Sequence, residues 1–245
     1  MLAAQDLAVR RGGAAVVAGV SASLRRGEIT AIVGPNGAGK SSLLLALAGL
    51  LPPVAGQVTL AGRALDAIAL RDRARAIGYL PQTPDIAWDI PTERLVALGR
   101  LPHGDRGEAA IDAAIAALAL DALRRRPVSQ LSGGERARAL LARVLAGEPD
   151  WILADEPLAA LDLAQQVNLI AHLKTCAAGG QGVVVVVHDL AIAMNHADRV
   201  LVLERGTLVA DGAPEAALTS AVIAQVWGVA GQWLGQPGAR ALHVV

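Results

Sequence analysis

The chain has 245 residues, enough for one large or two small domains and for a core that needs no disulfide or metal. Its 22 basic and 22 acidic side chains cancel, which argues against the strongly basic surface of nucleic-acid-binding proteins. One cysteine, Cys176, excludes a framework of internal disulfides and fits a reducing compartment.

A mean hydropathy of +0.44 raises the question of a membrane segment. A spanning helix needs about 20 consecutive apolar residues. The longest apolar stretches end or break too early, at Pro52, Asp112 and His188. The first eleven residues lack the basic-then-apolar layout of a signal peptide. We therefore expect a soluble, cytoplasmic chain.

The first 80 residues are predicted to form short strands and one helix. The helix is expected at residues 41–50, and the strands at residues 7–9, 16–24, 28–33, 57–60 and 76–80. The middle of the chain, about residues 84–146, changes to a helical pattern, clearest at residues 92–98, 108–120 and 136–145. This block has the character of an insertion.

Strands and helices alternate in the last third of the chain. Strands are expected at residues 151–154, 183–187 and 199–204, with helices at residues 162–177 and 190–197. Wholly apolar strands between helices predict a parallel α/β sheet buried on both faces, and the early strands an antiparallel addition to it. Residues 228–245 show no pattern that assigns them.

Residues 34–41 match the phosphate-binding pattern G-x-x-x-x-G-K-[ST], between an expected strand and an expected helix. Glycines let the backbone curl so that successive N–H groups face phosphate oxygens, and the helix start adds its positive end. Lysine reaches the β- and γ-phosphates, and the serine hydroxyl binds Mg²⁺. The predicted nucleotide-binding residues are Gly34, Pro35, Asn36, Gly37, Ala38, Gly39, Lys40, Ser41 and Ser42.

Two acids follow the apolar strand at residues 151–154. In phosphate-loop enzymes such an acid binds Mg²⁺, which makes Asp155 the candidate metal ligand. Glu156 points another way and is the candidate general base for an attacking water. His188 also follows an expected strand and emerges at the edge where α/β proteins bind ligands, and Gln82 follows the strand at residues 76–80. A lone His after a strand is usually structural, and neither residue indicates a function by itself.

A second anion-binding feature lies upstream of the two acids. Ser132, Gly133, Gly134 and Glu135 open an expected helix, where exposed N–H groups and a hydroxyl attract anions. One nucleotide needs only one such helix start. A symmetric dimer resolves this, because each nucleotide then lies between the phosphate loop of one copy and the Ser132 helix of the other.

This set of motifs resembles the nucleotide-binding subunit of ATP-binding-cassette (ABC) transporters over about residues 2–215. The motifs occur in family order: the Walker A loop, the Q-loop at Gln82, the signature, the Walker B strand with Asp155 and Glu156, the D-loop ending at Asp162, and the switch His188. The resemblance implies a P-loop NTPase (RecA-like) core with an antiparallel β subdomain and an inserted α-helical subdomain. It also implies ATP and Mg²⁺ as ligands.

The resemblance also implies roles for individual residues. Gln82 touches Mg²⁺ or water, His188 contacts the γ-phosphate, and Asp162 reaches across the dimer. The expected divisions are a core at residues 1–82 and 147–215, a helical subdomain at 83–146 and a C-terminal segment at 216–245. Lys40, Gln82, Glu156 and His188 are the expected catalytic residues, and Ser41, Gln82 and Asp155 the metal ligands.

The chain departs from the family pattern at two positions. Arg11 replaces the aromatic residue that stacks on adenine, although a guanidinium can also stack on a base. Ala160 replaces a serine that is common in the D-loop, so one hydroxyl contact across the dimer is missing.

Residues 79–82 and 90–103 resemble the importers of metal chelates, namely ferric siderophores, haem and vitamin B12. This implies membrane permease subunits bound at about residues 83–106, an external solute-binding protein, and a place at the cytoplasmic face of the cell membrane. Trp88 is a candidate anchor for the permease, because Trp is enriched at binding hot spots, or it packs under the helical insertion.

Other functions stay open. A soluble ABC ATPase serving an assembly scaffold, such as iron–sulfur cluster building, keeps every motif, and only residues 82–103 favour the transporter. A phosphotransferase acting on a small molecule has no use for the second phosphate clamp at residues 131–135. A purely regulatory binding module does not need Glu156 and His188.

Overall fold

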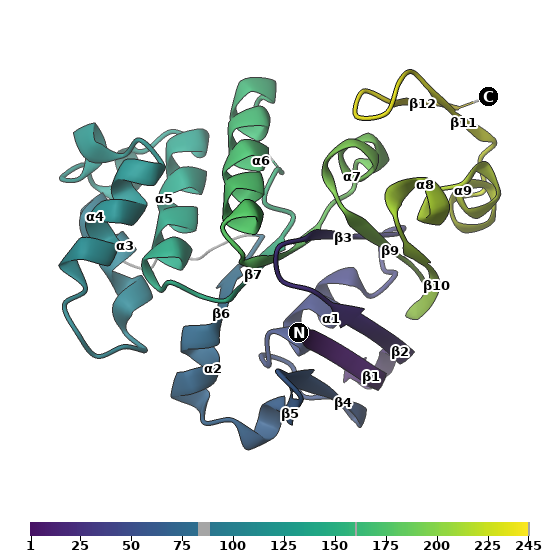
Figure 1. Cartoon of the computed structure of the whole chain (residues 1–245), viewed down its shortest axis with the longest axis horizontal. Helices are drawn as coiled ribbons and strands as arrows, with labels where there is room; N and C mark the ends of the chain where they lie inside the picture. Colours follow the sequence, from purple (N-terminus) through teal and green to yellow (C-terminus); the bar gives the residue numbers. More distant parts are fainter. Residues whose placement is uncertain (83–88, 160, 245) are drawn as a thin grey trace.

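The structure is a computed structural model that describes residues 1–82, 89–159 and 161–244. Its centre is a six-stranded sheet in the order β10-β9-β3-β8-β7-β6 (Figure 1). These strands are β3 (Ile29–Val33), β6 (Ile77–Leu80), β7 (Trp151–Asp155), β8 (Gly182–Val186), β9 (Arg199–Glu204) and β10 (Thr207–Gly212). Neighbours pair in parallel except β9 and β10, which are antiparallel.

The central strands β3, β7 and β8 are buried along their whole length. Helices cover both faces of such a parallel sheet, and for that reason the strands are apolar throughout rather than alternating. The expected parallel α/β core is confirmed. Because β3, β8 and β7 are adjacent, the loops after them meet at one edge of the sheet.

A second sheet of four strands has the order β2-β1-β4-β5. Its strands are β1 (Leu2–Arg11), β2 (Ala14–Leu24), β4 (Ala55–Leu60) and β5 (Arg63–Ala64). Helix α1 (Lys40–Leu47) packs between the two sheets through Leu43, Leu44 and Leu47, and η1 (Leu65–Ala67) and α2 (Leu70–Ala76) follow β5. The expected antiparallel addition is confirmed.

The predicted first strand was too short, at residues 7–9. Strand β1 pairs with β2 from Leu2 to Arg11, but its register shifts three times between Ala4 and Arg10. Bulges of this kind break the alternation of apolar and polar residues, so the period of two is lost although the strand continues.

The helical block lies to one side of the central sheet (Figure 1). It contains α3 (Thr92–Ala97), η2 (Leu98–Arg100), α4 (Glu108–Ala117), η3 (Asp121–Leu123), η4 (Val128–Gln130) and α5 (Gly133–Ala146). Leu95, Ile115 and Leu141 join the same hydrophobic cluster as one face of the sheet. Helix α5 was predicted to begin at residue 136, but it begins at Gly133.

The remaining helices are α6 (Leu163–Ala178), α7 (Leu190–His196), α8 (Pro214–Ala217) and α9 (Ser220–Trp227). The tail, which sequence left unassigned, forms a hairpin of β11 (Gly231–Leu234) and β12 (Ala241–Val244). Each of these strands has four residues, too few to display a period. Within the described residues, we find no helix with both the length and the apolar character needed to cross a bilayer.

Candidate functional site

The loop between β3 and α1 requires glycine at two positions. Gly34 has φ 151°, and a Cβ atom there would lie 2.2 Å from the carbonyl oxygen of Leu203. Gly39, the N-cap of α1, has φ 97°, and its Cβ would lie 2.2 Å from the carbonyl oxygen of Val16. Only glycine fits both the backbone angle and the space, so these residues give the loop its curled shape.

The side chain of Lys40 lies inside this loop. Its Nζ donates to the carbonyl oxygens of Gly34 at 2.8 Å and Pro35 at 3.0 Å, and the residue is only 5% exposed. Burial lowers the pKa of Lys40, and the negative charges of Glu156 and Asp155 partly oppose this shift. Two carbonyl oxygens of the loop therefore hold the amino group of Lys40 at the position where the loop curls.

Ser41, the next residue, contacts the end of β7. Its hydroxyl donates to Oδ1 of Asp155 at 3.0 Å. Asp155 is 5% exposed, and burial raises the pKa of its carboxyl group. The two side chains that sequence analysis names as metal ligands, one on the loop and one at the strand end, therefore lie within hydrogen-bonding distance.

Sequence analysis missed Tyr79 as part of this site. Burial, together with the charge of Asp155 and a hydrogen bond to it, raises the pKa of Tyr79 to about 12. Strand β6 pairs with β7 so that Tyr79 lies opposite Leu153, two residues before Asp155. A signal was available, because Tyr79 is the single tyrosine and stands three residues before Gln82.

Glu156 turns away from Asp155, with a positive φ of 48°. Its Oε2 accepts a hydrogen bond from Nε2 of Gln82 at 2.6 Å, and its Oε1 lies 2.5 Å from Nε2 of His188. The Glu156 side chain is 13% exposed and that of His188 is 49% exposed. Gln82 and His188, which follow β6 and β8, therefore both contact the carboxylate of Glu156, which follows β7.

The start of α5 is stabilised by a capping box. The Ser132 hydroxyl accepts from the backbone N–H of Glu135 at 3.3 Å, and Glu135 Oε2 accepts from the N–H of Ser132 at 2.8 Å. The hydrogen bond from the Ser132 backbone lowers the pKa of Glu135. A side chain at Gly134 would lie 2.2 Å from Cδ of Gln165 in α6, so Gly134 lets the two helices approach closely.

The other predicted residues lie as follows. Arg11 is exposed at the end of β1, while its neighbour Arg10 binds the carbonyl of Gly13. Asp162 caps α6 by accepting from the N–H of Gln165 at 2.8 Å. Gly133, Asn36 and Gly37 are exposed, whereas Ala38 and Ser42 are buried. Trp88 and Ala160 lie outside the described residues.

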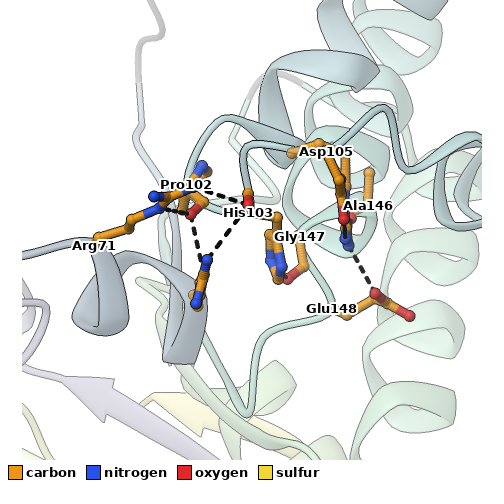
Figure 2. Close-up of polar contacts among 9 residues, drawn as sticks. Arg71, Pro102, His103, Asp105, Ala146, Gly147 and Glu148 are labelled. Carbon is orange, nitrogen blue, oxygen red and sulfur yellow. Dashed lines mark hydrogen bonds and ion pairs between the residues drawn. The ribbon is translucent and has the colours of Figure 1, made fainter.

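The segment expected to meet a membrane partner is tied to α2. The guanidinium groups of Arg71 and Arg75 both donate to the carbonyl oxygens of Pro102 and His103, the Arg71 bonds measuring 2.5 and 2.9 Å (Figure 2). Gly104, at φ 70°, leaves room for Arg71, since a Cβ there would lie 2.2 Å from Nη2.

The same segment is also tied to the end of α5. Arg100 is 7% exposed and donates to Asp105 at 2.6 Å, to Glu148 at 2.7 Å and to the carbonyl of Ala146 at 3.0 Å. His103 Nε2 lies 2.9 Å from the carbonyl oxygen of Gly147 (Figure 2). Residues 100–105 thus join α2 to the C-terminal end of α5, the helix that Ser132 caps at its start.

Comparison with known proteins agrees with this geometry. The family model described as "ABC transporter" matches residues 17–159. Hemin import ATP-binding protein HmuV of Nocardia farcinica is 45% identical over 236 residues, covering 92% of this chain and 82% of that protein. HmuV of Pseudomonas entomophila is 42% identical over 237 residues, covering 94% and 93%.

Among solved structures, a dimeric ATP-binding cassette in a post-hydrolysis state, bound to ADP and Pi, superposes with a TM-score of 0.76 at 25% identity. The match covers 88% of this chain and 99% of that one. The fold, the order of the motifs and the relatives agree, and the chain belongs to the ABC transporter family.

Proposed function

We propose that this chain is the ATP-hydrolysing subunit of a membrane transporter that imports haem. The observation that supports hydrolysis is the Glu156 carboxylate, bound by Gln82 and His188 beside the loop that contains Lys40. The relatives named as hemin import proteins support the solute class, and they favour a transporter over an ATPase for cluster assembly.

ATP is the substrate, and residues 34–42 bind its phosphates. The backbone N–H groups of the curled loop and the start of α1 face the anion. Lys40 exchanges its contacts with the Gly34 and Pro35 carbonyls for phosphate oxygens, which are stronger acceptors. Arg11, exposed at the end of β1, stacks on the base.

The residues fit Mg²⁺. Ser41, Asp155 and Gln82 offer a hydroxyl, a carboxylate and an amide oxygen, and Mg²⁺ prefers oxygen ligands from few side chains together with substrate phosphates. The 3.0 Å contact between Ser41 and Asp155 already brings two of these donors together. When bound, the ion neutralises charge on the phosphate oxygens.

Glu156 acts as the general base. It accepts a proton from water aligned with the γ-phosphate, while the Gln82 amide and His188 orient its two oxygens. Lys40 and His188 then stabilise the negative charge on the transferred phosphoryl group.

A second copy of the chain completes the site. The first N–H groups of α5, at Gly133 and Gly134, have no acceptor within their own helix, and they face the γ-phosphate bound by the partner copy. The dimer of the related cassette supports this arrangement. Asp162 reaches the partner across the same interface.

The membrane partner is a permease that binds about residues 83–106, where Leu101 is 71% exposed. An external solute-binding protein supplies haem, and the chain resides at the cytoplasmic face of the membrane. With this assignment, the core consists of residues 1–82 and 147–215. The helical subdomain is residues 83–146, and the C-terminal segment is residues 216–245.

Recovery of tagged chain from detergent-solubilised membranes, followed by mass spectrometry, tests the proposal. We expect a stoichiometric polytopic protein, and ATP-dependent haem uptake once that complex is placed in liposomes. Recovery of soluble partners alone, under conditions that preserve known membrane complexes, would overturn the transporter assignment in favour of an assembly ATPase.

A further inference from the structure

The C-terminal hairpin has no part in the function described so far. In it Trp233 lies opposite Leu242, and both pack against the main hydrophobic cluster. Trp233 Nε1 also donates to the carbonyl of Leu218 at 2.7 Å. An isolated two-stranded hairpin is marginal in water, so these contacts fix its position next to α8 and α9 (Figure 1).

Asn195 of α7 joins this hairpin to the catalytic edge of the sheet. Its Oδ1 accepts from the backbone N–H of Arg240 at 2.8 Å, and its Nδ2 donates to the carbonyl of Arg240 at 2.8 Å. This reciprocal pair fixes both the distance and the orientation of the carboxamide relative to the hairpin backbone.

The same Nδ2 also donates to the carbonyl of Ala191, in the first turn of α7, at 2.9 Å. That turn is capped by Asp189, whose Oδ1 accepts from the N–H of Ala191 at 2.7 Å. Asp189 directly follows His188. Hydrogen bonds of 2.7–2.9 Å therefore lead from the backbone of Arg240 through Asn195 and Ala191 to Asp189, the residue next to His188.

One side-chain contact, between Nη1 of Arg240 and Sδ of Met194 at 4.0 Å, also joins the hairpin to α7, but on the part of α7 away from His188. A groove of about 590 Å³ separates the two parts, with His188, Leu190 and Ala191 on one side and Leu242 and Val244 of the hairpin on the other. Leu190, Ala193 and Met194 pack α7 into the core, and across the groove the Asn195 contacts provide the hydrogen-bonded link between α7 and the hairpin backbone.

We propose that Asn195 is a positioning residue for His188, through which the C-terminal hairpin aligns the switch histidine with Glu156 and the γ-phosphate. The carboxamide acts through the first turn of α7 and touches neither nucleotide nor metal. The inference rests on the ATPase activity of the proposed function and is independent of the transported solute.

The test is Asn195→Asp in the full-length chain, which replaces the NH₂ donor by an oxygen that repels both carbonyls. We expect kcat for ATP hydrolysis to fall about tenfold, the effect of a small misplacement of a reacting group, with unchanged KM for ATP. Asn168→Asp is the matched control, the same change at an exposed position of α6.

A double-mutant comparison separates positioning from a general structural effect. In a His188→Ala background we expect Asn195→Asp to cause no further loss of kcat. If the losses multiply, or if Asn195→Asp alone leaves kcat unchanged, the inference is wrong. Asn195→Ala removes the side-chain hydrogen bonds to Arg240 and Ala191 without adding charge. If the aspartate variant does not fold, the alanine variant takes its place, and the same loss of kcat is expected. A wild-type chain that does not hydrolyse ATP refutes the proposed function itself.

Discussion

The Nε2 atom of Gln82 lies 2.6 Å from Oε2 of Glu156, across 74 residues of sequence. Because β6 and β7 are adjacent parallel strands, the residues that follow them meet although they are far apart in the chain. Gln82 also directly precedes the segment that we assign to the membrane partner, about residues 83–106. The proposed general base is therefore in direct contact with the residue that leads into that segment.

Glu156→Gln should abolish most ATP turnover while leaving nucleotide binding intact. The amide cannot accept a proton from water, so we expect hydrolysis to fall by about 10²–10⁴. Lys40 and the phosphate loop are unchanged, so the affinity for MgATP stays the same. Phosphate release and nucleotide titration measure the two quantities. Glu108→Gln, the same change at an exposed site on α4, serves as the control, and hydrolysis by Glu156→Gln at the wild-type rate removes Glu156 from this role.

Lys40→Ala should weaken the binding of MgATP itself. The change removes the ammonium group that lies within the loop, and a hydrogen bond to a charged group contributes enough that affinity falls about tenfold or more. Lys174→Ala is a matched control. Lys174, the other lysine of the chain, lies in α6 and contacts His196 of α7 instead of the phosphate loop. Equal affinities of Lys40→Ala and wild type in a titration would contradict the assignment.

Gly39→Ala should destabilise the fold more than Gly62→Ala. Both glycines have positive φ, 97° and 80°, so alanine is strained at either position. A Cβ at Gly39 also meets the Val16 carbonyl at 2.2 Å, whereas at Gly62 nothing lies within 4 Å. We expect a difference of about 1–3 kcal/mol in the free energy of unfolding, measured by chemical denaturation. Equal losses would show that backbone angle alone governs the Gly39 position.

Asp105→Asn should lower stability in a pH-dependent way. The hydrogen bond and charge of Arg100 lower the pKa of Asp105, so its contribution is fully present above the ordinary carboxyl range and is lost as pH falls through the lowered value. The difference in unfolding free energy between wild type and variant should therefore be largest near neutral pH and shrink below about pH 4. In an Arg100→Met background the same substitution should show no such trend; if the trend persists, Arg100 is not its cause.

Local sequence signals predicted the phosphate loop and the two acids, whereas Gln82 and His188, which follow other strands, gained their roles only from the resemblance to a family. The parallel α/β pattern implies that these residues share one edge of the sheet, but their contacts depend on the strand order β8-β7-β6, which the sequence does not specify. The capping box at Ser132 was also visible in sequence, as a serine followed three residues later by glutamate. It was read only as an anion site, and for that reason the start of α5 was placed at residue 136 instead of Gly133.

Other features could not be predicted from local patterns. Tyr79 becomes part of the site only through its pairing across β6 and β7 and through burial beside Asp155. The hairpin of β11 and β12 depends on single contacts, such as that of Asn195 with the Arg240 backbone, between residues distant in sequence. Neither feature produces a period or a motif, so only the assembled fold displays it.

The position of β3 between β8 and β9 also constrains how the chain acquires its activity during synthesis. Both neighbours of β3 belong to residues 182–204, which leave the ribosome long after the phosphate loop has emerged. Until then β3 has unpaired edges on both sides and the contact of Gly34 with Leu203 cannot form. A nascent or truncated chain that carries the complete phosphate loop thus still lacks the neighbouring strands against which the folded protein holds that loop.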